Sequence, residues 1–165
     1  MENIKDIKRL EILLACLLML IPLILRFLEG YFRYSISNYA YSDYNYVFVM
    51  LLTLAGAMFI YNGIGFKRHW YNSILGISLF GVVLTPHLDY PILHYLFASI
   101  FFLGSILAIG LSSNIAFRSF KYLVTTIITV GLGIHFVFGT FSLLVSEWIS
   151  IIPLSTHFII KSITR

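Results

Sequence analysis

The sequence predicts an all-α protein: a six-transmembrane-helix bundle with both termini in the cytoplasm and a Tyr-rich interfacial segment between helices 1 and 2. The composition is the first reason, because 59% of the 165 residues are hydrophobic and only 11% are charged. A soluble domain carries about 25% charged residues. A chain of this length cannot bury so much apolar surface in one aqueous core, so lipid must cover part of it.

Six apolar stretches are the second reason, and we expect them to form a single integral membrane domain over residues 1–165. The expected spans are about residues 10–28, 46–66, 70–85, 91–111, 122–144 and 147–163. The third stretch is short. Pro91 suits the first helical position of the fourth span, because its missing N–H costs nothing there.

The distribution of Lys and Arg is the third reason. If the N-terminus is cytoplasmic, the inner segments carry nine of the eleven basic residues, and only Arg26 and Arg33 remain outside. Such an excess is typical of cytoplasmic segments, so we expect both termini on that side. The nine are Lys5, Lys8, Arg9, Lys67, Arg68, Arg118, Lys121, Lys161 and Arg165.

The connection from Glu29 to Asn45 is the longest, and Tyr side chains gather in and beside it. They are Tyr31, Tyr34, Tyr39, Tyr41, Tyr44 and Tyr46, six of the eleven in the chain. Tyr prefers the headgroup level, where its ring is in apolar surroundings and its hydroxyl is wet. We therefore expect this segment to lie along the outer interface and to cover a pocket in the outer leaflet.

Polar residues concentrate on the predicted outer side, whereas small and aliphatic residues are expected to seal the inner half. Glu147 is expected to pair with Arg26 or Arg33, and Lys161 to reach the inner headgroups. His135 lies fourteen residues after Lys121, which places it about 21 Å across the membrane, in the outer half. The expected ligand or pocket residues are Arg26, Arg33, Tyr39, His94, His135 and Glu147.

The leading functional prediction is a non-catalytic membrane protein that needs no cofactor. Its outer pocket would bind a lipid, a small amphiphile or a partner subunit, and membrane lipids, a protein partner or further copies of the chain are the expected partners. Nucleic acid is not expected, because the basic residues lie singly or in pairs and form no continuous patch.

Two alternatives remain open. The first is a membrane-embedded, zinc-dependent lipid hydrolase, with His87, Asp89, His94 and His135 as metal ligands and Ser35, Ser37 and Asp89 as catalytic residues. Its Ser, Asp and His inventory resembles that of alkaline ceramidases. The second alternative is an ion- or proton-conducting oligomer.

Several short motifs resemble a family of bacterial membrane proteins, the domain of unknown function 998 group. They are Ser35-Ile36-Ser37-Asn38-Tyr39, Val47-Phe48-Val49, His94 early in the fourth span, and Glu147 and Lys161 bounding the sixth. Asn45-Tyr46 stands where those proteins tend to have Arg-Asp, and Phe158 where they tend to have Trp. The resemblance implies a compact six-helix bundle in a bacterial cytoplasmic membrane, and it implies no reaction.

Overall fold

The computed structural model describes residues 2–65, 70–111, 118–140 and 142–164, and this part of the chain is all-α. It consists of six α-helices and one short 3-10 helix. The helices are α1 (Glu2–Glu29), η1 (Ser37–Tyr41), α2 (Asn45–Gly65), α3 (Tyr71–Leu84), α4 (Pro91–Leu111), α5 (Arg118–Phe138) and α6 (Leu143–Ile163).

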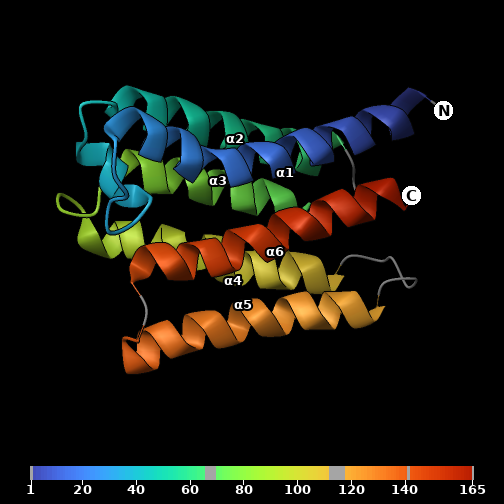
Figure 1. The fold of residues 1–165 in the computed structure, drawn as a ribbon. Coiled ribbons are helices and arrows are strands. Elements are labelled where there is room, and N and C mark those ends of the chain that lie inside the picture. Colours follow the sequence, from blue (N-terminus) through green and yellow to red (C-terminus); the bar gives the residue numbers. More distant parts are fainter. Residues whose placement is uncertain (1, 66–69, 112–117, 141, 165) are drawn as a thin grey trace.

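The six α-helices form a closed ring. Each helix packs against the next one along the chain, and α1 also packs against α6. The N- and C-termini lie at the same end of the bundle, here named the terminal end (Figure 1). The opposite end, named the capped end, carries residues 30–44, and these residues are named the capping segment (Figure 1).

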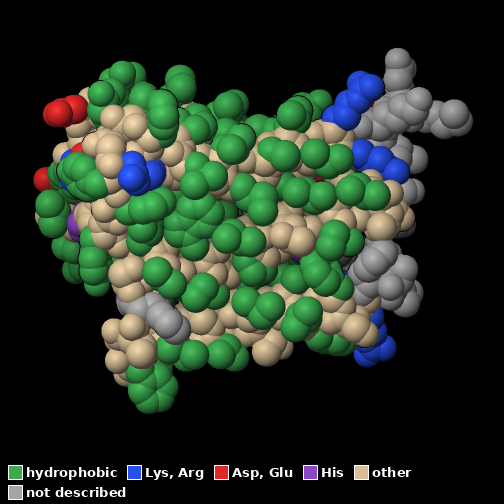
Figure 2. All heavy atoms as spheres, viewed as in Figure 1, with side chains coloured by type: hydrophobic (Ala, Val, Ile, Leu, Met, Phe, Trp, Pro, Cys, Tyr) green, Lys and Arg blue, Asp and Glu red, His purple; other side chains and the backbone are tan. Residues whose placement is uncertain are grey.

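The helices have the length and composition of membrane spans. Five of the described helices are long and apolar enough to cross a bilayer, and α3, with 14 residues, is apolar but shorter. The face drawn in Figure 2 shows a broad band of hydrophobic side chains between the two ends of the bundle. Lys and Arg side chains lie at both ends of this face, and Asp and Glu side chains lie at the capped end. These features are consistent with a membrane protein.

The predicted spans match the helices closely in the middle of the chain. They match less well at the start, where α1 begins at Glu2 and not at residue 10, and in the last third. The fourth span agrees with α4. The fifth and sixth predicted spans, 122–144 and 147–163, differ from the helices, because α5 ends at Phe138 and α6 begins at Leu143. Gly139 ends α5 in the left-handed region, with φ 61°, and its N–H donates to the carbonyl of His135 at 2.9 Å. The Ser142 hydroxyl then caps α6 by accepting from the Val145 N–H at 3.3 Å. A glycine stop followed by a serine cap is a common way to separate two helices.

The backbones of α2 and α3 approach closely because glycines line their contact. A Cβ atom added at Gly56 would lie 3.1 Å from the carbonyl oxygen of Gly76, and one added at Gly76 would lie 2.9 Å from the backbone nitrogen of Ile60. Nearby, the buried Asn72 side chain donates to the Asn62 side chain at 2.6 Å. Small residues with an interhelical polar contact are a usual means of joining helices in lipid.

Some residues behind the orientation prediction cannot be placed. Lys67, Arg68 and Arg165 lie outside the described residues, and so does the side chain of Lys5.

Candidate functional site

A cavity of about 60 Å³ lies inside the bundle, next to the capping segment. Most of its lining is aliphatic or aromatic, and the polar lining residues are Ser37, His94 and Glu147. Two of the six predicted pocket residues, His94 and Glu147, therefore meet here with one of the alternative catalytic residues, Ser37. The other lining residues are Ile36, Phe48, Leu52, Leu79, Val82, Ala98, Phe101, Phe102 and Ile151.

Glu147 joins α6 to the capping segment. Its side chain is buried, with the residue 8% exposed, and Oε2 accepts a hydrogen bond from the Ile36 N–H at 2.6 Å. One turn earlier, the Leu144 N–H donates to the carbonyl of Tyr34 at 2.9 Å. The predicted ion pair between Glu147 and Arg26 or Arg33 is wrong in the described structure, because a backbone N–H holds this carboxylate instead.

His94 is fixed by the end of α3. The residue is 4% exposed, and its Nδ1 lies 2.7 Å from the carbonyl oxygen of Thr85. A carbonyl can only accept, so Nδ1 carries the hydrogen, and in the neutral ring Nε2 is then a hydrogen-bond acceptor. The ring centroid of His87 lies 5.7 Å from that of His94.

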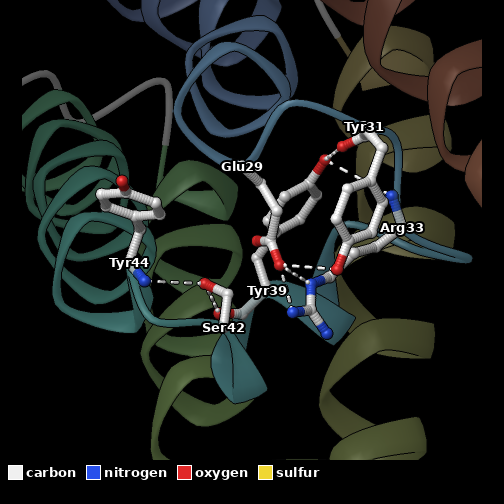
Figure 3. Close-up of polar contacts among 6 residues, drawn as sticks. All are labelled: Glu29, Tyr31, Arg33, Tyr39, Ser42 and Tyr44. Carbon is white, nitrogen blue, oxygen red and sulfur yellow. Dashed lines mark hydrogen bonds and ion pairs between the residues drawn. The ribbon is translucent and has the colours of Figure 1, made fainter.

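Arg33, predicted to line the pocket, instead pairs with Glu29 at the end of α1 (Figure 3). Its Nε donates to Glu29 Oε1 at 2.9 Å, its Nη2 contacts the same oxygen, and the Tyr31 hydroxyl donates to that oxygen at 3.0 Å. The hydrogen bond to Glu29 raises the pKa of both Arg33 and Tyr31. Arg33 therefore stabilises the contact between the capping segment and the end of α1, and it does not line the cavity.

Tyr39 is the buried centre of the capping segment. Its hydroxyl donates to the carbonyl of Tyr31 at 3.2 Å and accepts from the Arg33 N–H at 3.4 Å. Burial raises the pKa of Tyr39. Ser42 closes the segment, since its hydroxyl donates to the carbonyl of Tyr39 at 2.9 Å and accepts from the Tyr44 N–H at 3.2 Å (Figure 3). The segment is thus a folded unit with its own hydrogen bonds.

The remaining predicted pocket residues lie elsewhere. The Arg26 guanidinium lies over the ring of Phe32, 5.3 Å from its centroid. His135 is partly buried near the end of α5, with its ring beside Phe136, and it does not line the described cavity.

The alternative catalytic and metal residues are only partly brought together. The hydroxyls of Ser35 and Ser37 lie 3.0 Å apart, while Asp89 accepts from the Tyr41 hydroxyl at 3.2 Å. Within the described ranges, no group of three or more His, Cys, Asp or Glu side chains is placed to hold a metal ion. The zinc-dependent hydrolase stays a prediction, which metal analysis of the purified protein would test.

A second polar cluster lies toward the terminal end, and it was not predicted from the sequence. Glu11 of α1 is fully buried; its Oε1 accepts from Lys161 Nζ at 2.9 Å and its Oε2 from the Ser162 hydroxyl at 2.8 Å. Lys161 is only 4% exposed, so the prediction that it reaches the inner headgroups is wrong. The prediction that small and aliphatic residues seal the inner half is also wrong, because Glu11, Lys161 and Ser162 are buried there. The available signal was an acidic residue inside the first apolar run, since such residues usually have a partner within the bundle.

Comparison with known proteins identifies a family and no activity. Neither the curated proteins nor the solved structures gave a match to the chain. The model of a family described as "Family of unknown function (DUF7103)" matches residues 20–162, which include every residue lining the cavity. No finding links the chain to the domain of unknown function 998 group, so that resemblance stays a prediction. The chain belongs to the DUF7103 family.

Proposed function

We propose that this protein crosses the membrane six times, with the terminal end in the cytoplasm and the capped end outside. We further propose that it is non-catalytic and that its cavity binds one small amphiphile or the polar end of a lipid. The cavity is the observation that supports the functional part of this proposal. Its lining is mostly apolar, contains the polar residues Ser37, His94 and Glu147, and lies next to the folded capping segment.

The path of the chain supports an even number of crossings, since both termini lie at one end of the bundle (Figure 1). The short helix α3 runs back between α2 and α4, and it packs against both. At about 1.5 Å per residue its 14 residues span ~21 Å, which a locally thinned bilayer accommodates at modest cost.

Exposed aromatic rings near both ends support the placement in a bilayer, because Tyr and Trp are enriched at both membrane interfaces. On α2, Tyr46 and Tyr61 are both exposed, and about 22 Å of helix separates them. The exposed rings near the capped end are Tyr31, Tyr34, Tyr41, Tyr46, Tyr90 and Tyr95, and those near the terminal end are Tyr61, Trp70 and Tyr122.

The charges support the orientation. Among the described residues, Lys8, Arg9, Arg118 and Lys121 lie toward the terminal end, against Arg26 and Arg33 at the capped end. This difference fits the excess of Lys and Arg in cytoplasmic segments. At the capped end, the charge of Arg33 is balanced by Glu29.

The hydrogen-bond partners of the Ser35 and Ser37 hydroxyls favour a binding function over a catalytic one. A nucleophilic serine needs a base within hydrogen-bond reach. Ser37 bonds to Ser35, and among the described side chains neither hydroxyl bonds to a His or Lys. The cavity is therefore better suited to hold a group than to cleave one.

A cavity-filling variant tests the proposal. Ala98 lines the cavity, and Ser99, its neighbour on α4, lines a different pocket. In native mass spectrometry from mild detergent, we expect the wild-type protein and Ser99→Leu to retain a bound amphiphile, and Ala98→Leu to lose it. Absence of any retained amphiphile from the wild-type protein, or equal retention by Ala98→Leu, would contradict the proposed function.

A further inference from the structure

We infer that the cavity selects a primary ammonium group carried on an aliphatic chain, with Glu147 as its counter-charge. This inference rests on the proposed function and names the class of ligand for the same site. Three observations carry it: the acceptors that line the cavity, the absence of a neighbouring cation among the described residues, and the small volume.

The cavity presents hydrogen-bond acceptors. Glu147 uses Oε2 to bind the Ile36 N–H, and its other oxygen, Oε1, accepts no hydrogen bond from the described residues. The Nδ1 hydrogen of His94 is committed to Thr85, so Nε2 of the neutral ring is also an acceptor. Two acceptors in one small space favour a ligand that donates several hydrogen bonds, and a primary ammonium has three N–H donors.

The buried carboxylate has no positive partner in the described structure. The described ion pairs join Arg33 to Glu29 and Lys161 to Glu11, and neither includes Glu147. Charged groups inside a membrane protein usually pair with one another, because an uncompensated charge is costly there. A ligand ammonium would supply the counter-charge that favours the ionised form of this carboxyl group in the apolar cavity.

The volume limits what can enter. The cavity volume is about 60 Å³, whereas pockets for drug-sized ligands are typically about 300–1,000 Å³. A primary ammonium suits so small a cavity better than a trimethylammonium group, which is bulkier and has no N–H to donate. The rings of Phe48, Phe101 and Phe102 line the same space, and aromatic faces attract cations.

A metal ion is a poorer fit. Among the described residues, one carboxylate and one imidazole line the cavity, whereas protein zinc sites use three or four such ligands. An organic ammonium therefore suits this lining better than a metal ion does.

The test compares three probes of equal chain length on the whole protein in detergent: hexylamine, hexanol and hexyltrimethylammonium. By titration calorimetry we expect the wild-type protein to bind hexylamine at least tenfold more tightly than the other two. Glu147→Gln should weaken hexylamine binding about tenfold, since a charge-assisted hydrogen bond is lost. The Gln amide oxygen can still accept from Ile36, so this variant should keep the melting temperature of the folded protein. Asp43→Asn removes an exposed carboxylate from the capping segment and should change nothing.

Liposomes distinguish a lipid headgroup from a free amine as the source of the ammonium. Retention of phosphatidylethanolamine, but not phosphatidylcholine, by the wild-type protein and its loss in Glu147→Gln would assign a headgroup. Hexylamine binding without phosphatidylethanolamine retention would assign a free amine. Hexanol binding as tight as that of hexylamine would overturn the ammonium inference and leave amphiphile binding intact, whereas no binding of any probe or lipid would overturn both.

Discussion

Glu11 shows how one buried charge can hold two helices together. Its carboxylate accepts from Lys161 and Ser162, so both of its oxygens have a partner although the residue is fully buried. A buried ion pair adds little stability compared with a well-packed apolar pair, but loss of one member leaves the other charge uncompensated. The contribution of this pair to the packing of α1 against α6 is therefore best measured by removing one of its members.

The first prediction concerns this pair. Glu11→Ala should lower the free energy of unfolding by about 3–5 kcal/mol, because Lys161 is left buried without its carboxylate. The double variant Glu11→Ala, Lys161→Met should recover much of this loss. Equilibrium unfolding in mixed micelles measures both values, and Asp6→Ala, an exposed acid on the same helix, is the control. A Glu11→Ala protein as stable as the control would contradict the role of the pair.

The second prediction concerns pH and the capping segment. Burial raises the pKa of Tyr39 above its ordinary value of 10.0. A raised pKa in the folded state means that the native protein holds this proton more tightly than the unfolded chain. The stabilisation is therefore complete below pH 10 and is lost as the pH rises through the folded pKa.

Thermal unfolding between pH 8 and 11 tests this, because the wild-type melting temperature should fall above pH 10. Tyr39→Phe should lower stability by about 1 kcal/mol at pH 8, the typical net value of a hydrogen bond. It should also show a smaller fall above pH 10, and an equal fall in both proteins would rule out Tyr39 as the titrating group.

The site residues show what sequence reasoning can and cannot find. His94 and Glu147 could be placed in one pocket, because both are ionisable residues near the same ends of apolar spans. The partner of Glu147 could not be found, because it is the Ile36 N–H, and a backbone group's position depends on how the capping segment folds. The partner of Arg33 was accessible, since Glu29 lies only four residues away.

At the scale of elements, the third prediction tests the close contact of α2 and α3. Gly76→Ala should destabilise the protein by about 1–3 kcal/mol, because the added carbon meets the backbone of α2 and forces it to shift. Gly133→Ala is the matched control on α5, where a Cβ has no neighbour within 4 Å. Thermal unfolding should rank the control at or slightly above the wild-type protein, since alanine favours a helix. Equal melting temperatures for the two variants would contradict tight packing at Gly76.

The ends of helices could be predicted where the sequence changes sharply from apolar to polar. They could not be predicted where the sequence stays apolar beyond the end of the helix. α2 and α4 end close to the predicted residues because charged or turn-forming residues flank their apolar runs. The connection between α5 and α6 reads Gly-Thr-Phe-Ser and carries no charge, so hydropathy continues through it. The end of α5 and the start of α6 depend on the left-handed conformation of Gly139 and on the Ser142 cap. A hydropathy pattern does not detect such local features.

At the scale of the whole molecule, α6 makes polar contacts at both ends of the helix ring. At the terminal end, Lys161 and Ser162 bind Glu11 of α1. At the capped end, Glu147 and Leu144 bind the capping segment. The number of helices, and the position of both termini at one end of the bundle, could be predicted from the apolar runs and the alternation of charge (Figure 1). The cavity volume could not, because it depends on how large side chains such as Phe48 and Phe101 pack.

The six crossings with both termini in the cytoplasm are most directly tested by cysteine labelling in intact cells. Cys16 is the one cysteine in the chain, so Cys16→Ser gives a background without thiols. Single cysteines are then placed at Asp43 and Asp89, at the capped end, and at Asp6 and Ser119, at the terminal end; all four residues are exposed. We expect a membrane-impermeant maleimide to label the first pair from outside and the second pair only after permeabilisation. Labelling of Asp43 and Asp89 from opposite sides, or of Asp6 from outside, would contradict the topology on which the proposed outer site depends.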